Sequence, residues 1–252
     1  MKYKVIIFSL LLLIGLNSYA ALGKTIKFAT EATYLPFESI TSSGEIRGLD
    51  IDIANALCKE IGVSCTFTNQ PFDSLITGLK LGKFDAVIAS MEITQERKKE
   101  VAFTNPYLFQ TVNFAAPIKS PFTTVSAKSL KGKTIGVQAG TTFEQYLCAH
   151  YKTTVQVNTY TSMTTAFIDL QAGRIDGILG DTILIANWLK QQNAASKFHL
   201  IGKPVDDALF KTGDGIAVKK ENGELLKALN GALAKIKAND ELDKIVQKYL
   251  PR

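Results

Sequence analysis

The stretch that decides the fold is LKLGKFDAVIAS, residues 79–90, because nearly the same pattern returns ninety-one positions later as LQAGRIDGILGD, residues 170–181. Leu, Gly and Asp are identical in the two copies, a cation follows each Gly, and small and branched apolar residues match elsewhere. Each copy is typical of a helix that ends at Gly, a short turn and a buried strand. The strands end on polar residues, Ser90 and Asp181. Because ligands bind at that end of strands in open α/β sheets, the repeat predicts two similar lobes with a ligand between them; chance similarity is the alternative.

Strand and helix signals alternate along the rest of the chain, which indicates an α/β protein rather than a sandwich or a helical bundle. A strand is expected at residues 25–30, and an apolar helical face at 50–61 is closed by Gly62. The spacing of Thr141 and Glu144 predicts a capping box that starts a helix in the second half. No low-complexity segment or flexible linker separates the halves, so we expect crossover strands to connect them.

Residues 1–20 have the pattern of a signal peptide. Lys2 and Lys4 precede an apolar run at 5–16, and Ser18-Tyr19-Ala20 fits a small-x-small cleavage site. The apolar run is shorter than the ~20 residues that a membrane helix needs. The sequence therefore predicts an exported, soluble chain that starts at Ala21.

The charge and the cysteines exclude several classes of function. Without Lys2 and Lys4 the formal charge falls from +6 to +4, and the basic residues form no cluster of the kind that nucleic-acid binding requires. In an exported protein Cys58 and Cys65 can close a small loop, whereas Cys148 has no obvious partner. No Cys/His cluster suggests a metal site, and we expect no cofactor.

Five segments together resemble the periplasmic polar amino-acid binding proteins of ABC importers, solute-binding protein family 3, especially the arginine, lysine/arginine/ornithine and histidine binders. They are residues 30–37, 48–53, 93–97, 137–142 and 173–176. The resemblance implies a two-lobed α/β fold, each lobe a central sheet flanked by helices, joined by two crossover strands. Lobe 1 is expected at 21–110 plus 212–252 and lobe 2 at 111–211. A periplasmic monomer that serves an ABC transporter membrane permease is also implied, as is a disulfide between Cys58 and Cys65.

A free amino acid needs separate receptors for its carboxylate, its ammonium group and its side chain. Arg97 suits the carboxylate because its planar guanidinium can donate two parallel hydrogen bonds, and it matches the family's carboxylate-binding arginine. Thr142 matches the family position that adds a backbone donor at a helix start, where an anion is favoured. From the residues alone, Arg97 could instead pair with Glu96 or Glu100 on a helix surface, and Thr142 could be an ordinary capping turn.

Asp181 is the candidate for the α-ammonium group. On chemistry alone it could equally be the N-cap of a helix at 182–191, but the resemblance implies a ligand contact. The first lobe is expected to contribute Ser90, Met91 and Glu92, with backbone or hydroxyl contacts from Ser90 and a second carboxylate from Glu92. Related proteins often carry a small hydroxyl residue at the position of Glu92.

The side-chain pocket decides specificity. Tyr34 and Phe72 match the aromatic pair that sandwiches the long ligand side chain in the basic amino-acid binders, although both could instead be core residues. An aromatic face attracts a cation by about 0.5–2 kcal/mol. Glu31 stands where that subgroup places an acid facing the distal cation. These residues favour arginine, then lysine or ornithine, then histidine. Phe143 and the pair Gln138-Ala139 depart from the family pattern near the distal pocket and leave the exact ligand open.

Two rival functions use the same scaffold. One is an exported dehydratase of cyclohexadienyl compounds, for which Glu92 is the candidate acid or base; fold alone does not settle function. The other is a protein that presents its ligand to a sensor. No Ser-His-Asp, Cys-His or metal-ligand spacing supports covalent or metal catalysis, so we expect a binding protein and not an enzyme.

Overall fold

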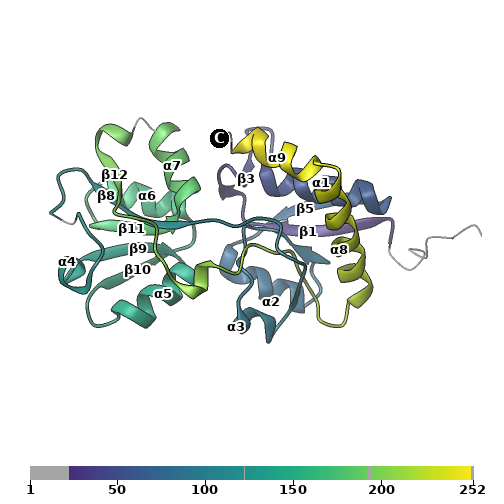
Figure 1. The fold of residues 1–252 in the computed structure, drawn as a ribbon, viewed down its shortest axis with the longest axis horizontal. Coiled ribbons are helices and arrows are strands. Elements are labelled where there is room, and N and C mark those ends of the chain that lie inside the picture. The colour runs from purple at the N-terminus through teal and green to yellow at the C-terminus, as the bar shows by residue number, and fades with distance from the viewer. Residues whose placement is uncertain (1–22, 122, 192–193, 251–252) are drawn as a thin grey trace, which may run out of the picture.

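Two five-stranded sheets, one in each of two lobes, form the frame of the computed structural model, which describes residues 23–121, 123–191 and 194–250 (Figure 1). The predicted signal peptide at 1–20 lies outside the described residues. The chain is an α/β protein, as predicted. Within the described residues, no helix has both the length and the apolar character that crossing a membrane demands.

The sheet of lobe 1 has the strand order β5-β1-β6-β13-β7. Neighbours β5, β1 and β6 are parallel, whereas β13 runs antiparallel to β6 and to β7. The strands are β1 Thr25–Thr30, β5 Ser64–Asn69, β6 Ala86–Val87, β7 Ala102–Phe103 and β13 Ala217–Val218. The flanking helices are α1 Leu49–Ile61, α2 Leu75–Lys80, α3 Gln95–Lys98, α8 Gly223–Ala238 and α9 Glu241–Tyr249, with a 3-10 turn η1 at Phe72–Ser74. A small sheet joins β2 Thr33–Tyr34, β3 Glu38–Ile40 and β4 Ile46–Arg47.

The sheet of lobe 2 has the equivalent order β10-β9-β11-β8-β12. Its strands are β8 Val112–Pro117, β9 Thr134–Gln138, β10 Gln156–Tyr160, β11 Gly177–Asp181 and β12 Phe198–Ile201. Its helices are α4 Ala127–Leu130, α5 Thr142–Tyr151, α6 Met163–Gln171 and α7 Thr182–Gln191, with 3-10 turns η2 Ala194–Ser196 and η3 Ala208–Phe210. The two copies of the repeat therefore supply α2-β6 and α6-β11, and each copy places its strand at the centre of a sheet.

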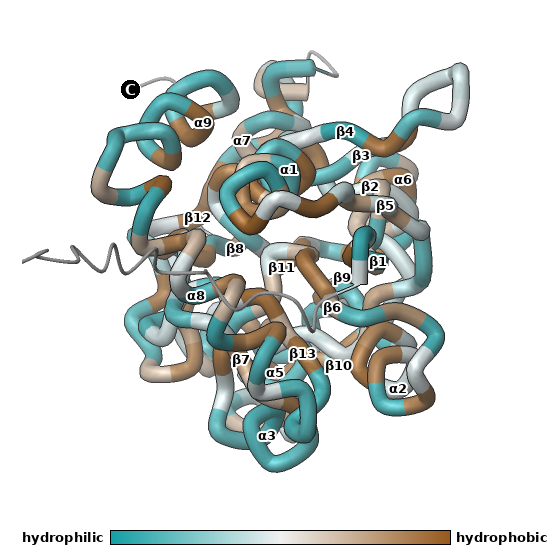
Figure 2. The backbone as a smooth tube through the Cα atoms, turned by 90° about the vertical axis from the view of Figure 1, so that its right-hand side faces the viewer, coloured by the Kyte–Doolittle hydropathy of each residue, from teal (hydrophilic) through white to brown (hydrophobic). Residues whose placement is uncertain are grey.

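The glycines of the repeat end their helices as predicted. Gly82 has φ 72° and Gly173 has φ 70°, in the left-handed region that side chains with a Cβ rarely adopt. No atom lies within 4 Å of a Cβ built on Gly173, so conformation and not space requires glycine there. Hydrophobic residues concentrate on inner strands such as β6, whereas the outer helix α3 is hydrophilic (Figure 2).

Two crossings, residues 104–111 and 202–216, carry the chain between the sheets and run side by side (Figure 1). Tyr107 donates its N–H to the carbonyl of Asp214 (2.9 Å), and the N–H of Asp214 donates to the carbonyl of Leu108 (2.8 Å). The pairing gives the lobes a narrow two-stranded connection, which is the geometry of a hinge.

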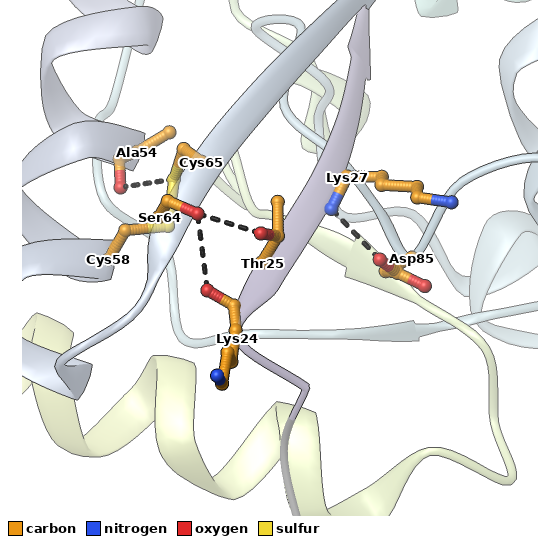
Figure 3. The surroundings of a disulfide bond; sticks show 8 residues. All are labelled: Lys24, Thr25, Lys27, Ala54, Cys58, Ser64, Cys65 and Asp85. Carbon is orange, nitrogen blue, oxygen red and sulfur yellow. Dashed lines mark hydrogen bonds between the residues drawn. A yellow bond between two sulfur atoms is a disulfide. The ribbon is translucent and has the colours of Figure 1, made fainter.

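A disulfide joins Cys58, near the end of α1, to Cys65 on β5, which confirms the predicted pairing (Figure 3). Beside it, the Ser64 hydroxyl is hydrogen-bonded to the hydroxyl of Thr25 (2.7 Å) and donates to the carbonyl of Lys24 (3.1 Å). The disulfide therefore connects helix α1 to β5, the edge strand of the lobe 1 sheet. Cys148 is exposed and free.

Candidate functional site

A small cavity lies between the lobes, at the carboxyl ends of the central parallel strands. Five of the predicted site residues line it: Glu31, Tyr34, Phe72, Ser90 and Glu92. The prediction did not include the remaining lining residues, which are Glu38, Ala89, Gln138, Thr141 and Phe143. Glu31 follows β1, Ser90 lies shortly after β6, and Gln138 ends β9. Both sheets thus direct polar residues into one space.

Arg97 is buried beside this cavity, where it lines a neighbouring groove. Thr94 caps α3 by accepting a hydrogen bond from the N–H of Arg97 (3.1 Å), which fixes where the side chain leaves the helix. The guanidinium donates from Nη1 to the carbonyl of Glu92 (2.8 Å) and from Nη2 to the carbonyl of Gly140 in lobe 2 (3.1 Å). It lies 5.4 Å from the centre of the Phe72 ring. A planar group with several donors at the lobe boundary can hold a carboxylate.

Arg97 does not pair with Glu96 or Glu100 on a helix surface, which was the alternative open from the sequence. Glu96 pairs with Lys99 (2.8 Å) and Glu100 pairs with Lys80 (2.6 Å), so the acids of the same segment have other partners. The nearest carboxylate oxygen to Arg97 is instead that of the buried Glu92, at 3.7 Å.

Asp181, the last residue of β11, contacts the other lobe directly. Its Oδ2 accepts a hydrogen bond from the Tyr34 hydroxyl (2.7 Å), and its buried Oδ1 has no hydrogen-bond partner among the described residues. Burial, and then the charge of Glu92, raise the pKa of Asp181 well above its ordinary value. An ammonium group placed here would satisfy the free oxygen and favour the ionised carboxylate.

Glu31 is buried in the cavity wall and also contacts lobe 2. Its carboxylate accepts hydrogen bonds from the Thr33 hydroxyl and from Nε2 of Gln138 (3.3 Å). Burial raises the pKa of Glu31. Gln138 was not among the predicted ligand-binding residues, although its departure from the family pattern had indicated a position near the distal pocket.

Thr142 and Met91 have different surroundings from the other predicted residues. Thr142 begins α5 and lies with Arg97 and Gly140 on a groove beside the cavity. Met91 has its side chain in the apolar core of lobe 1, where it is 1% exposed, and only its carbonyl is engaged, by the N–H of Gly215 (3.0 Å). The structure therefore does not bring the Met91 side chain to the cavity.

The buried charges of the described residues are strongly unbalanced. Arg97 is the one buried base, whereas the buried acids are Glu31, Glu38, Asp50, Glu92, Asp181 and Asp214. Desolvation is the largest cause that raises the pKa of each of these carboxyl groups. A ligand that brings more positive than negative charge would offset this imbalance.

Stability is expected to fall as the pH rises through the range in which Asp50 titrates. Burial raises the pKa of Asp50 from 3.8 to about 6. Between those values the native state holds a proton that the unfolded chain has released, so the free energy of unfolding decreases with rising pH, by at most roughly 1.4 kcal/mol per pH unit for one proton. Urea unfolding across this window measures the slope. Asp50→Asn should show a more positive slope than wild type; identical slopes for the two proteins would contradict the assignment.

The fold and the site define a two-lobed ligand-binding protein with its site between the lobes. The chain belongs to the bacterial extracellular solute-binding proteins, family 3, whose family model matches residues 26–252.

Relatives and solved structures cover nearly the whole chain. The ABC transporter arginine-binding protein 1 of Escherichia coli (strain K12) is 46% identical over 236 residues, 92% of this chain and 93% of that protein. A Salmonella typhimurium periplasmic binding protein, whose structure was solved to explain its high arginine specificity, is 38% identical with a TM-score of 0.82, covering 90% of this chain and 99% of that one. An ancestral amino acid-binding protein, a precursor of cyclohexadienyl dehydratase, is 30% identical with a TM-score of 0.79, covering 90% and 95%.

Proposed function

We propose that the protein captures a basic L-amino acid, with arginine the preferred ligand, between its two lobes and delivers it to an ABC permease. The observation that carries this proposal is the charge imbalance of the buried site, where one arginine faces several carboxyl groups. A basic amino acid brings one negative and two positive groups, so it complements this arrangement. The relatives named for arginine binding support the same ligand.

Each end of the ligand has a receptor in this proposal. Arg97 binds the α-carboxylate, with a backbone donor from the start of α5 at Thr142. Asp181 binds the α-ammonium group through the oxygen that Tyr34 does not engage. Ser90 and Glu92 add contacts from lobe 1, and Met91 contributes at most its backbone.

The distal cation lies toward Glu31 in this proposal, between the rings of Tyr34 and Phe72. Both rings line the cavity, and aromatic faces attract a desolvated cation. We propose lobe limits of 21–110 plus 212–252 and 111–211, with closure about the paired crossings. A ligand that touches both lobes then stabilises the closed form by its differential affinity.

The cellular setting follows from the same proposal. Residues 1–20 direct export and are removed, and the mature monomer works in the periplasm as a transport protein and not as an enzyme. The closed complex docks on the membrane permease. The alternative is that the same site binds a ligand that the protein presents to a sensor. Deletion of the gene without a defect in amino-acid uptake would favour that alternative.

A thermal-shift panel tests the ligand. The mature chain, stripped of carried-over ligand by unfolding and refolding, is screened against all amino acids and ornithine. Ligand at a thousandfold excess over Kd stabilises the native state by roughly 4 kcal/mol. We expect the largest shift with arginine, smaller shifts with lysine and ornithine, and none with glutamate. A flat response to every amino acid would reject the proposal.

Replacing Glu31 by Gln should weaken arginine binding more than histidine binding. The substitution keeps the shape of the side chain but removes the charge that faces the distal cation, at an expected cost of roughly tenfold to hundredfold in Kd. Calorimetry with arginine and with its neutral isostere citrulline isolates the effect, because only arginine should lose affinity. The exposed Glu45→Gln is the matched control, and equal losses for arginine and citrulline would remove Glu31 from the distal pocket.

An enzyme on the same scaffold is the second candidate, favoured by the dehydratase precursor among the structural neighbours. Glu92 is buried at the cavity, and burial raises its pKa, as a general acid would require. Release of an aromatic product from a cyclohexadienyl acid, followed by absorbance, tests this. Turnover that disappears in Glu92→Gln would support the enzyme; no turnover, together with arginine binding, would leave transport.

A further inference from the structure

Two buried carboxyl groups of lobe 1 belong to the wall of the cavity, where Glu38 is a lining residue and Asp50 lies behind it. Glu38 begins β3 and is 1% exposed, and Asp50 lies in the first turn of α1 and is fully buried. Each side chain acts on the pKa of the other as a hydrogen-bonding group. Oε2 of Glu38 and Oδ1 of Asp50 are both buried, and neither has a hydrogen-bond partner among the described residues as long as both groups are ionised. Because two carboxylates have no donor to share, one of the pair must carry a proton.

The other oxygen of Asp50 identifies which group is ionised. Oδ2 accepts two hydrogen bonds, from the N–H of Ser90 (2.7 Å) and from the hydroxyl of Tyr107 (2.8 Å). Two donors on one carboxyl group favour its ionised form, so Asp50 is the carboxylate of the pair and the proton belongs to Glu38. The hydrogen bond between Ser90 and Asp50 connects the pair to the site, because Ser90 lines the cavity.

Ser90 has an uncommon backbone conformation. Its φ is 42°, in the left-handed region that residues with a Cβ seldom occupy. Such a conformation persists only when the surroundings enforce it, and the hydrogen bond from its N–H to Asp50 supplies that constraint. The Ser90 hydroxyl is itself buried without a hydrogen-bond partner.

We propose that Glu38 is a neutral carboxylic acid that orients the Asp50 carboxylate, and that Asp50 holds the Ser90 amide in the conformation that shapes the floor of the cavity. Glu38 and Asp50 are then positioning residues for ligand binding, which rests on the function proposed above. The same carboxylate holds Tyr107, so it also ties the site to the first crossing between the lobes.

The groups around Glu38 all oppose its ionisation. Asp50 on α1, Glu31 after β1 and Asp214 before β13 each act on it with negative charge, and burial adds a larger effect, so its pKa lies well above the ordinary value. Tyr34 on β2 and Tyr107 in the first crossing also face it, and neither brings a positive charge. The pKa of Asp50 is about 6 because hydrogen bonds from Ser90, Tyr107 and Glu38 offset part of its burial. At neutral pH the proton is therefore on Glu38.

Amide substitutions distinguish the donor from the acceptor. Arginine affinity is measured by calorimetry at neutral pH for Glu38→Ala, Glu38→Gln and Asp50→Asn. We expect Glu38→Ala to lose roughly tenfold to hundredfold, and Glu38→Gln to restore affinity to within about threefold because its amide still donates to Asp50. Asp50→Asn should bind more weakly than Glu38→Gln because it lacks the charged acceptor. The reverse order, equal losses, or no loss in any variant would overturn the proposal.

Hydrogen exchange at the Ser90 amide gives a readout that needs no ligand. In the full mature chain we expect this amide to be protected in wild type and in Glu38→Gln, and to exchange at least about tenfold faster in Glu38→Ala. The exposed Glu45→Gln serves as the control. If wild type binds no amino acid, the proposed function fails, but the exchange rates still test whether Glu38 and Asp50 hold the Ser90 amide. Equal protection of that amide in wild type and in Glu38→Ala would overturn the proposed role of Glu38.

Discussion

Asp181→Asn is expected to abolish arginine capture while leaving the fold at least as stable as wild type. The asparagine keeps the size of the side chain and can still accept the hydrogen bond from Tyr34. It removes the negative charge that would face the α-ammonium group, and loss of one member of a buried charged pair costs about 2–5 kcal/mol, or roughly thirtyfold to several thousandfold in Kd. The free energy of unfolding should not fall, because the substitution also relieves repulsion with Glu92.

Desamino-arginine makes this test specific. Wild type should prefer arginine strongly over the analogue that lacks the α-amino group, and Asp181→Asn should lose most of that preference. Asp240→Asn, at an exposed position, should behave as wild type in calorimetry and in urea unfolding. Near-normal arginine affinity in Asp181→Asn would remove the residue from its proposed role.

Arg97→Met is the second substitution with a large expected effect. It removes the cation that would hold the α-carboxylate, together with the hydrogen bonds to the carbonyls of Glu92 and Gly140. We expect an affinity loss of at least about a hundredfold. Stability should also fall, because the neighbouring Glu92 loses the nearest positive charge. Arg97→Lys keeps the charge but not the planar fork, so its affinity should lie between those of wild type and Arg97→Met.

Agmatine, which is arginine without its carboxylate, separates the binding role from the structural one. Wild type should discriminate strongly against agmatine, whereas Arg97→Met should bind arginine and agmatine almost equally. The exposed Arg47→Met controls for loss of a surface cation. Retained discrimination in Arg97→Met would mean that another group receives the carboxylate.

Most of the fold could be predicted because the repeat contains its own stop signals and strand patterns. Gly82 and Gly173 end their helices in the left-handed conformation, and the strands that follow take the centre of each sheet. Equivalent positions in equivalent sheets then bring Ser90 and Asp181 toward the boundary between lobes. These predictions depend on backbone conformation and on the pattern of apolar residues, and both can be recognised in short stretches of sequence.

The site was less predictable because several of its contacts join distant segments. Glu38 and Asp50 belong to different elements, and no spacing rule pairs two acids that meet only when the small sheet packs beside α1. Gln138 reaches Glu31 from the opposite lobe. Met91 shows the opposite case, because its neighbours Ser90 and Glu92 line the cavity whereas its own side chain lies in the core of lobe 1.

The position of β13 affects the order in which the two lobes can fold. This strand, Ala217–Val218, inserts between β6 and β7, so the last part of the chain supplies an inner strand of the lobe 1 sheet. The strands of lobe 2 come from one uninterrupted stretch, residues 112–201. Until the carboxyl-terminal segment arrives, β6 and β7 have unpaired edges and α1 lacks its partner α8. Lobe 2 can therefore fold before the carboxyl-terminal segment is available, whereas lobe 1 needs roughly the last forty residues to complete its sheet. Truncation after the second crossing would leave the lobe 1 sheet incomplete, with strand edges that can pair with other chains.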